Sequence, residues 1–266
     1  MKIGFIGGGN MAEAILSSVL ARKLADPEDL SVSDVLDSRL SYLVQKFRIT
    51  TSKDNRKVVK NKEIVILAVK PQTFNDVAAG IRGALQPNQL AISIIAGKNI
   101  RTLSSSLDHN CLVRSMPNTP AQIGEGITVW TATPQVNPQQ KKWAASILGV
   151  MGTEIFVDDE KYLDMATAVS GSGPAYVFLF IESLEAAAVK LGFSPEVAGR
   201  LVMQTLQGST HLLQKSGKPP RELRQMVTSP GGTTAEAIAV FEKGGFASLI
   251  ENAITAAYEK AKKLGS

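Results

Sequence analysis

The feature that most constrains the fold of this chain is a glycine-rich turn near its start, between an apolar run and an amphipathic segment. The run Lys2 to Ile6 is typical of a short parallel strand that is covered on both faces. Gly7, Gly9 and Ala12 then fit the pattern G-x-G-x-x-G/A. The residues that follow have apolar side chains at spacings of three and four, which predicts a helix with one apolar face.

This turn suits a bound dinucleotide for specific physical reasons. Gly7 permits the tight turn, Gly9 lets a pyrophosphate approach the backbone, and Ala12 lets helix and strand pack closely. The helix start offers N–H groups and partial positive charge to the phosphates. We expect Asn10 to cap the helix, with Glu13 as its capping-box partner. The alternative is a turn that binds nothing, but the flanking strand and helix favour dinucleotide binding.

An acidic residue ends the second expected strand, Leu30 to Asp34, about twenty residues beyond the glycines. A carboxylate at this place binds ribose hydroxyls of NAD and repels the 2′-phosphate of NADP. The nearest basic residue that follows is Arg39. Taken alone, Asp34 therefore favours NADH over NADPH, and its alternative role is to cap the next helix.

Further strands alternate with helices, which predicts a parallel sheet with right-handed crossovers. The remaining expected strands are Ile49 to Thr51, Glu63 to Val69, Leu90 to Ile95, Cys111 to Met116, Ile127 to Ala132 and Glu154 to Val157. Ligands bind such sheets beyond the carboxyl ends of the strands. The segments expected at those ends are Gly7 to Asn10, Asp34, Lys70-Pro71, Ala96-Gly97 and Pro117 to Thr119.

Beyond Asp158 only helical segments are expected, so the fold class is α/β with two domains. We predict a Rossmann-type, doubly wound dinucleotide-binding domain over residues 1–157 and an all-helical domain over residues 158–266. The segment Ala175 to Leu191 has little polar face, as in helices buried in a large core or an oligomer interface. We therefore expect the second domain to pair with a second copy.

Composition argues against several classes of function. The net charge is +5, but the basic residues are scattered with few aromatic residues among them, so we expect no nucleic-acid partner. No apolar run is long enough to span a membrane, and we expect no signal or transit peptide. The one cysteine suits a reducing compartment, and we expect a cytoplasmic protein. No residues show metal-ligand spacing.

The usual catalytic side chains are scarce. His109 and Cys111 lie close in sequence, but a loop histidine and a buried thiol are the simpler interpretation. His211 lies in a helix without an obvious partner. Hydride transfer suits this inventory because the cofactor carries the reactivity and the protein positions and polarises.

A second glycine-rich loop, Thr228 to Thr234, leads into a helix and is the candidate substrate site. Gly231 and Gly232 leave N–H groups at the helix start, which suits a carboxylate. Thr233 and Thr234 add hydroxyl groups that donate or accept hydrogen bonds. An ordinary loop with threonine capping explains these residues equally well, and the pattern leaves both open.

Five motifs in order resemble the pyrroline-5-carboxylate reductase family, and the match runs over nearly the full length. The motifs are Gly4-Phe5-Ile6-Gly7-Gly8-Gly9-Asn10-Met11, Ala68-Val69-Lys70-Pro71, Met116-Pro117-Asn118-Thr119-Pro120, Gly171-Ser172-Gly173-Pro174-Ala175-Tyr176 and Ser229-Pro230-Gly231-Gly232-Thr233-Thr234. The resemblance implies a Rossmann domain and a helical dimerisation domain, with dimers that often assemble into rings. It implies reduction of 1-pyrroline-5-carboxylate to L-proline with NAD(P)H, the last step of proline biosynthesis.

The resemblance also assigns roles to individual residues. It implies cofactor contacts from Ile6, Gly7, Gly8, Gly9, Asn10, Met11, Asp34, Asn55, Ala68, Val69, Lys70, Pro71 and Ala96. It implies substrate contacts from Ser229, Gly231, Gly232, Thr233 and Thr234, with Thr234 as the catalytic residue that hydrogen-bonds the ring nitrogen. Asp34 departs from many relatives, which have a small or neutral residue there, so the choice between NADH and NADPH stays open.

Two other functions remain as alternatives. A dehydrogenase of the 3-hydroxyacid type uses a lysine in the first long helix of its second domain. Here the segment Ser170 to Leu191 has only Lys190, at its far end, which argues against that type. A non-catalytic nucleotide sensor on the same fold would need the dinucleotide site but not the second glycine loop.

Overall fold

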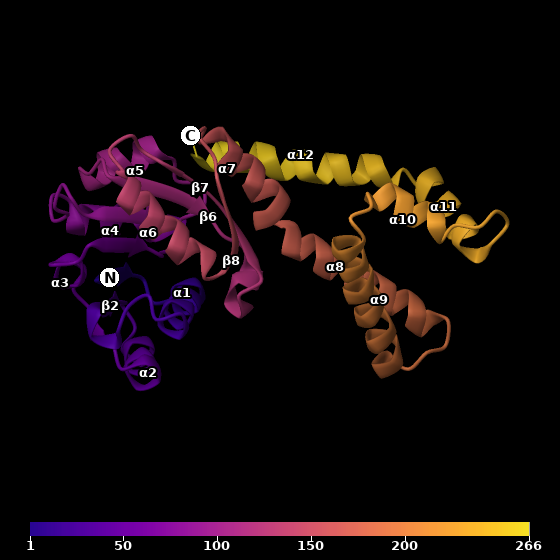
Figure 1. The fold of residues 1–266 in the computed structure, drawn as a ribbon, viewed down its shortest axis with the longest axis horizontal. Helices are drawn as coiled ribbons and strands as arrows, with labels where there is room; N and C mark the ends of the chain where they lie inside the picture. Colours follow the sequence, from indigo (N-terminus) through magenta and orange to yellow (C-terminus); the bar gives the residue numbers. More distant parts are fainter. Residues whose placement is uncertain (266) are drawn as a thin grey trace. The chain divides into compact units, whose positions relative to one another are not determined.

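The computed structural model describes residues 1–265, and its elements follow the predicted order (Figure 1). The strands are β1 (Ile3–Ile6), β2 (Leu30–Ser33), β3 (Thr50–Ser52), β4 (Ile64–Leu67), β5 (Leu90–Ser93), β6 (Leu112–Met116), β7 (Gly126–Ala132) and β8 (Gly152–Phe156). The helices among them are α1 (Asn10–Ala21), α2 (Asp37–Phe47), α3 (Asn55–Val59), α4 (Phe74–Ile81), α5 (Ile100–Leu107) and α6 (Pro138–Gly149). The predicted strands and helices of this part are therefore present, with shifts of one to three residues at their ends.

The strands form one sheet in the order β3-β2-β1-β4-β5-β6-β7-β8. The order reverses between β1 and β4, which makes the carboxyl ends of these two strands the switch point of the sheet. All described pairs are parallel except β6 with β7, which is antiparallel. The expectation of a parallel sheet is wrong at this pair, because only the short 3₁₀ segment Thr119–Ile123 joins the two strands.

Helices cover both faces of the sheet, as a doubly wound fold requires. On one face α1 and α6 pack through buried residues such as Ile15, Leu16 and Ile147. On the other face α4 and α5 pack through Phe74 and Leu103 among others. The four residues of each of β1, β2, β4 and β5 are all buried. This explains why β1, β4 and β5 are nearly continuous apolar runs. β2 alternates instead, and its buried Ser31 and Ser33 donate to the carbonyls of Val58 and Phe5.

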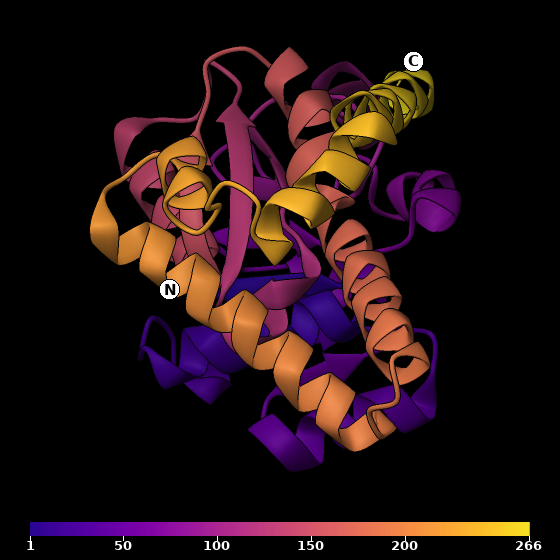
Figure 2. The same cartoon turned by 90° about the vertical axis from the view of Figure 1, so that its right-hand side faces the viewer.

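From Lys161 onward the described chain is helical, as predicted. The helices are α7 (Lys161–Ala166), a π-helical turn (Thr167–Gly171), α8 (Gly173–Lys190), α9 (Pro195–Ser216), α10 (Pro220–Met226), α11 (Thr233–Lys243) and α12 (Phe246–Gly265). Figure 2 shows α8 and α9 as two long helices that diverge from their short connection. Among the described residues, no helix is long and apolar enough to cross a membrane.

The chain divides into two compact units. Unit 1 contains Met1–Pro174 together with the segment from Ala257 onward, and unit 2 contains Ala175–Ala256. The break lies later than the predicted one after residue 157, because α7 packs against β6 and β7 through groups such as Arg114. The predicted domain boundary after residue 157 therefore differs from the boundary between the compact units, which follows Pro174. The boundary at residue 157 stays a prediction.

Unit 2 exposes many large apolar side chains. On α8, Val177, Phe178 and Leu179 are 51%, 58% and 63% exposed. Within unit 2, the buried apolar residues of the described chain are Ala198 and Val202. An apolar surface of this extent is typical of a protein–protein interface, as expected from the sequence of α8.

Candidate active site

The glycine turn after β1 has the geometry that its sequence predicts. Gly7 adopts a positive φ of 94°, and its N–H donates to the carbonyl of Ser33 at 2.9 Å. A Cβ added at Gly7 would lie 2.6 Å from the carbonyl oxygen of Ala68, so only glycine fits. A Cβ added at Gly9 would meet no atom within 4 Å, which leaves open space at that point of the turn. Ala12 is 1% exposed, because α1 packs closely on the sheet.

Asp34 lies directly beside this turn. Its Oδ2 accepts a hydrogen bond from the N–H of Gly8 at 2.9 Å, and its Oδ1 accepts one from the N–H of Leu36 at 3.1 Å. The carboxylate therefore joins the carboxyl end of β2 to the glycine turn. It does not cap α2, whose cap is Leu36 and has no side-chain hydrogen bond. The alternative of a capping role for Asp34 is thus wrong.

The predicted capping box at the start of α1 is absent. Gly9 is the N-cap, without a side-chain hydrogen bond, and Asn10 is the first residue of the helix. Glu13 instead accepts hydrogen bonds from Arg39, Tyr42 and Lys46 of α2, and three donors outweigh the one backbone N–H that a capping box offers. Among residues 1–265, the N–H groups of Asn10, Met11 and Ala12 have no acceptor, so the helix start presents donors to an anion.

Arg39 is a residue of this site that sequence reasoning missed as a functional group. Its Nε donates to the carbonyl of Gly8, its Nη2 lies 3.4 Å from the carbonyl of Gly9, and it forms an ion pair with Glu13. Partial burial disfavours the charge of Glu13, but hydrogen bonds from Lys46, Tyr42 and Arg39 lower its pKa to about 2. The available signal was the position of Arg39 in the first turn of the helix that follows Asp34.

The other predicted cofactor residues lie at the same edge of the sheet, because β1, β2, β4 and β5 are parallel neighbours. Ala68 follows β4, and its N–H donates to the carbonyl of Ile6 at 2.8 Å. After it come half-buried Val69 and Pro71 and exposed Lys70, while half-buried Ala96 follows β5. Asn55 begins α3 just beyond β3. The structure thus places the predicted set along the carboxyl edge of β3, β2, β1, β4 and β5, with the switch point near its middle.

The second glycine-rich loop connects α10 to α11 within unit 2. Gly231 has a positive φ of 71°, and the N–H of Gly232 donates to the carbonyl of Ser229 at 3.0 Å. A Cβ added at Gly232 would lie 2.6 Å from Oγ of Ser229, so a larger residue there would displace the serine side chain. Thr234 is half-buried, and its neighbour Thr233 is exposed.

This loop does not use threonine to cap its helix. The N-cap of α11 is Gly232, and no side chain caps it. Among the described residues, the N–H groups of Thr233, Thr234 and Ala235 find no acceptor. The alternative of an ordinary loop with threonine capping is therefore wrong. The loop offers several N–H donors and a hydroxyl at a helix start, which suits a small carboxylate.

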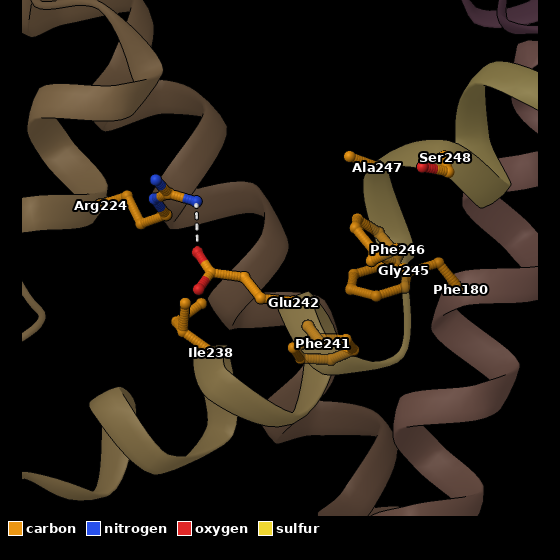
Figure 3. Close-up of a pocket in the computed structure, with 9 residues that line it drawn as sticks. All are labelled: Phe180, Arg224, Ile238, Phe241, Glu242, Gly245, Phe246, Ala247 and Ser248. Carbon is orange, nitrogen blue, oxygen red and sulfur yellow. Dashed lines mark ion pairs between the residues drawn. The ribbon is translucent and has the colours of Figure 1, made fainter.

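A cavity of about 470 Å³ lies elsewhere in unit 2 (Figure 3). Its walls come from α8, α10, α11 and α12 and are mostly apolar, with Phe180, Phe241 and Phe246 among them. Arg224 and Glu242 form an ion pair of 3.8 Å at one side, as Figure 3 shows. The residues that line it do not include the loop from Ser229 to Thr234, so this apolar cavity is separate from the candidate carboxylate site.

His109 and Cys111 are both buried, and each has a partner inside the protein. Nε2 of His109 lies 2.8 Å from the carbonyl of Gln89, and burial lowers the pKa of this histidine. Sγ of Cys111 donates to Oε1 of Gln140, and burial raises the pKa of this thiol. His109 lies in the loop between α5 and β6, as expected, and is only 5% exposed there. Within residues 1–265 no cluster of three metal-ligating side chains exists.

Comparison with known proteins matches two parts of the chain to two families. Residues 160–264 match the family described as "Pyrroline-5-carboxylate reductase dimerisation". Residues 2–97 match the family described as "NADP oxidoreductase coenzyme F420-dependent". The pyrroline-5-carboxylate reductase of Synechocystis is 39% identical over 265 residues, which covers 100% of this chain and 98% of that protein. That of Pseudomonas aeruginosa is 38% identical and covers 99% of this chain and 96% of that protein.

Solved structures agree with the sequence relatives. A pyrroline-5-carboxylate reductase from Coxiella burnetii superimposes with a TM-score of 0.90 at 37% identity, covering 100% of this chain and 98% of that one. The pyrroline carboxylate reductase of Plasmodium falciparum, solved with NADP bound, also has a TM-score of 0.90, at 35% identity and with the same coverage of both chains. The likeness therefore extends over both units and includes the sequence as well as the fold.

Proposed function

This chain belongs to the pyrroline-5-carboxylate reductase family, and on that premise we propose that it reduces 1-pyrroline-5-carboxylate to L-proline with NAD(P)H. The observation that carries the proposal is the loop from Ser229 to Thr234, which offers free N–H groups and a hydroxyl to a small carboxylate. A dinucleotide site alone would suit many oxidoreductases. A second site for a carboxylate, in a chain whose full-length relatives are named for this substrate, specifies the reaction.

We propose that the cofactor lies along the switch point of the sheet. The N–H groups at the start of α1 would bind the pyrophosphate, and Gly9 leaves the space for it. Asp34 and Asn55 would contact the adenosine end. The remaining cofactor residues would be Ile6, Gly7, Gly8, Gly9, Asn10, Met11, Ala68, Val69, Lys70, Pro71 and Ala96.

The carboxylate of Asp34 bears on the choice of cofactor. At the carboxyl end of β2, beside the glycine turn, it would accept hydrogen bonds from the 2′- and 3′-hydroxyls of NADH, while it would repel a 2′-phosphate. Against this, the Plasmodium falciparum relative was solved with NADP. We propose that the chain uses both cofactors and prefers NADH, with Asp34 as the residue that sets the preference.

The proposed chemistry asks little of the protein beyond positioning. The bound cofactor supplies a hydride to C5 of the ring, and the ring nitrogen takes up a proton, so that the C=N bond becomes a CH–NH bond. The N–H groups of Gly231, Thr233 and Thr234 would hold the carboxylate. Gly232, whose N–H donates to the carbonyl of Ser229, would line the site and shape the turn together with Ser229. The hydroxyl of Thr234 would hydrogen-bond the ring nitrogen and stabilise its developing charge or hand on its proton.

We propose further that the chain works as an oligomer in the cytoplasm. The exposed apolar side chains of α8 and the match to a dimerisation family support self-association. A ring of dimers is the larger assembly that we infer from the family resemblance. Neither nucleic acid nor a membrane has a role in this proposal.

The first test is the absorbance of reduced nicotinamide with purified protein and 1-pyrroline-5-carboxylate, in parallel with NADH and NADPH. We expect oxidation that depends on the imine, and the ratio of the two rates reports the effect of Asp34. If folded protein binds the dinucleotide but oxidises neither cofactor, the reductase proposal fails. The nucleotide sensor then becomes the better explanation, and its test is whether variants of Gly231 and Gly232 keep the cellular role.

A further inference from the structure

Arg39 reaches from α2 to the glycine turn, although it lies about thirty residues away along the chain. Its Nε donates to the carbonyl of Gly8, and its Nη2 lies 3.4 Å from the carbonyl of Gly9. The same Nη2 pairs with Glu13 in the first turn of α1. One guanidinium therefore holds two consecutive carbonyl groups of the turn that the proposed function assigns to the cofactor.

The contact of Arg39 with these carbonyl groups also determines the direction of the neighbouring N–H groups. The described chain has no cis peptide bond, so each C=O points opposite to the N–H of the next residue. With the carbonyls of Gly8 and Gly9 facing Arg39, the N–H groups of Gly9 and Asn10 face away from it. The N–H of Gly8 is bound separately by Asp34 at 2.9 Å. Three successive peptide groups of the turn are thus fixed by two side chains of opposite charge.

The side toward which these N–H groups point has room for a ligand. A Cβ added at Gly9 would meet no atom within 4 Å, and neither Gly9 nor Asn10 has an acceptor for its N–H among the described residues. Such a row of backbone donors is the usual binding site of a pyrophosphate. The carbonyl of Gly9 also accepts the N–H of Glu13 at 2.9 Å, so α1 itself helps to hold it. For the carbonyl of Gly8, Arg39 is the donor found in the described part of the chain. Without Arg39 the peptide between Gly8 and Gly9 could rotate its electronegative oxygen toward the phosphates.

Arg39 is itself held in place, which separates this role from direct contact with a phosphate. Its side chain is 20% exposed, and Glu13, its partner, also binds Tyr42 and Lys46 at 2.8 Å each. Nε and Nη2 are both engaged inside the protein, and only Nη1 remains for a ligand. A guanidinium that faces inward in this way is suited to shape the turn rather than to read a 2′-phosphate.

We propose that Arg39 is a positioning residue for the cofactor pyrophosphate, which it serves by holding the carbonyl of Gly8 away from the phosphates and so turning the N–H of Gly9 toward them. The inference rests on the proposed dinucleotide site. Because the pyrophosphate is common to both cofactors, loss of Arg39 should weaken the binding of NADH and of NADPH by the same factor. A residue that bound the 2′-phosphate would weaken NADPH alone.

The test compares Arg39→Met, Arg39→Lys and the control Lys46→Met in the full-length protein. Dissociation constants for NADH and NADPH are measured by nicotinamide fluorescence, and thermal unfolding of the apoprotein confirms folding. We expect Arg39→Met to weaken both cofactors about tenfold or more, by the same factor. Arg39→Lys is expected to stay weakened, since an ammonium cannot span two carbonyls as a planar fork does. Lys46→Met removes another partner of Glu13 and is expected to change both constants less than about twofold.

Other results would overturn the inference in distinguishable ways. If Arg39→Met loses affinity for NADPH alone, Arg39 is a ligand of the 2′-phosphate. If Arg39→Lys binds both cofactors as tightly as the wild type, the positive charge of Arg39 is sufficient and its planar shape has no role. If Arg39→Met has the same dissociation constants as the wild type, Arg39 has no role in cofactor binding. The proposed function is tested separately, by imine-dependent oxidation of the reduced cofactor in the wild type. If Arg39→Met fails to fold, Glu13→Gln replaces it, since this variant loosens Arg39 without removing it. We then expect a smaller loss that is again equal for the two cofactors.

Discussion

Arg114 of β6 and Glu160 form an ion pair of 2.8 Å, in which the arginine side chain is 5% exposed and the glutamate 31%. The second guanidinium nitrogen pairs with Asp164 of α7, also at 2.8 Å. Glu160 accepts a further hydrogen bond from the N–H of Ile100, at the start of α5. This network fastens α5 and α7 to the same strand and explains why α7 belongs to unit 1.

We therefore predict that Arg114→Met lowers the free energy of unfolding by about 2–3 kcal/mol, because it leaves two carboxylates together without their cation. Partial exposure of the two carboxylates keeps the loss below that of a fully buried pair. Urea unfolding measures the change. Lys161→Met, which removes the exposed pair with Asp159, is the matched control and is expected to cost less than about 0.5 kcal/mol. An equal loss in both variants would contradict a special role for the Arg114 network.

Substitution of Gly7 and of Gly9, the two outer glycines of the first turn, should affect different properties. Gly7→Ala should lower stability, and Gly9→Ala should weaken cofactor binding. Gly7→Ala places a Cβ 2.6 Å from a carbonyl oxygen at a positive φ, and we expect it to destabilise the fold by about 1–3 kcal/mol. Gly9→Ala enters open space at a φ of −65°, so we expect the same melting temperature as the wild type. Its Cβ would instead stand where the pyrophosphate is proposed to approach, and we expect about tenfold or greater weakening of both cofactors. Tight binding by Gly9→Ala would move the pyrophosphate elsewhere.

Asp34→Asn tests the source of cofactor preference with little change in shape. The amide oxygen of asparagine can still accept the hydrogen bond from Gly8, while the negative charge is gone. We expect the ratio of kcat/KM for NADPH over NADH to rise about tenfold, since one repulsive charge near a phosphate is removed. Asp37→Asn, on an exposed residue of the same loop that pairs with Lys53, is the control and should leave the ratio unchanged.

Thr234→Ala removes the hydroxyl proposed to contact the ring nitrogen. We expect turnover to fall by about ten- to a thousandfold, the usual scale for one polarising donor. Thr234→Ser should keep most of the activity, because it retains the hydroxyl. Thr228→Ala is the control, since the hydroxyl of Thr228 donates to the carbonyl of Arg224 and only stabilises the preceding turn. Unchanged kinetics in Thr234→Ala would remove this residue from the mechanism.

The depressed pKa of Glu13 predicts an acid-dependent part of the stability. Partial burial disfavours its charge, but hydrogen bonds from Lys46, Tyr42 and Arg39 lower the pKa from 4.5 to about 2. The ionised group therefore stabilises the folded state fully above pH 4.5 and loses this contribution as the pH falls toward 2. Glu13→Gln should remove about 1 kcal/mol of the stability difference between neutral and acid solution. Urea unfolding at several pH values measures it, and an unaltered pH profile would refute it.

Local patterns were sufficient to predict the parts of the site that depend on one segment of chain. The glycine turn and the half-buried residues after β4 follow from short sequence patterns, because turn geometry and strand burial depend on neighbouring residues. Asp34 was also found, since the end of β2 adjoins the turn in any such fold. The helical region was recognised from its apolar faces.

What failed depends on groups that are distant in sequence. The capping box at Asn10 was wrong because Glu13 found better partners on α2, a helix whose orientation no local pattern gives. Arg39 was seen only as the nearest cation for the same reason. The antiparallel pairing of β7 depends on the lack of a crossover helix, which a list of strands does not reveal.

The path of the last helix has a consequence for how the chain can be divided. The chain leaves unit 1 after Pro174 and returns at Ala257, and in unit 1 Ala261 of α12 is buried and Leu264 lies against Gly97. A single cut between the units would therefore strip the cofactor-binding part of a segment that covers it. A truncation at a single point of the chain therefore cannot isolate unit 1 intact, because its last segment comes after unit 2 in the sequence.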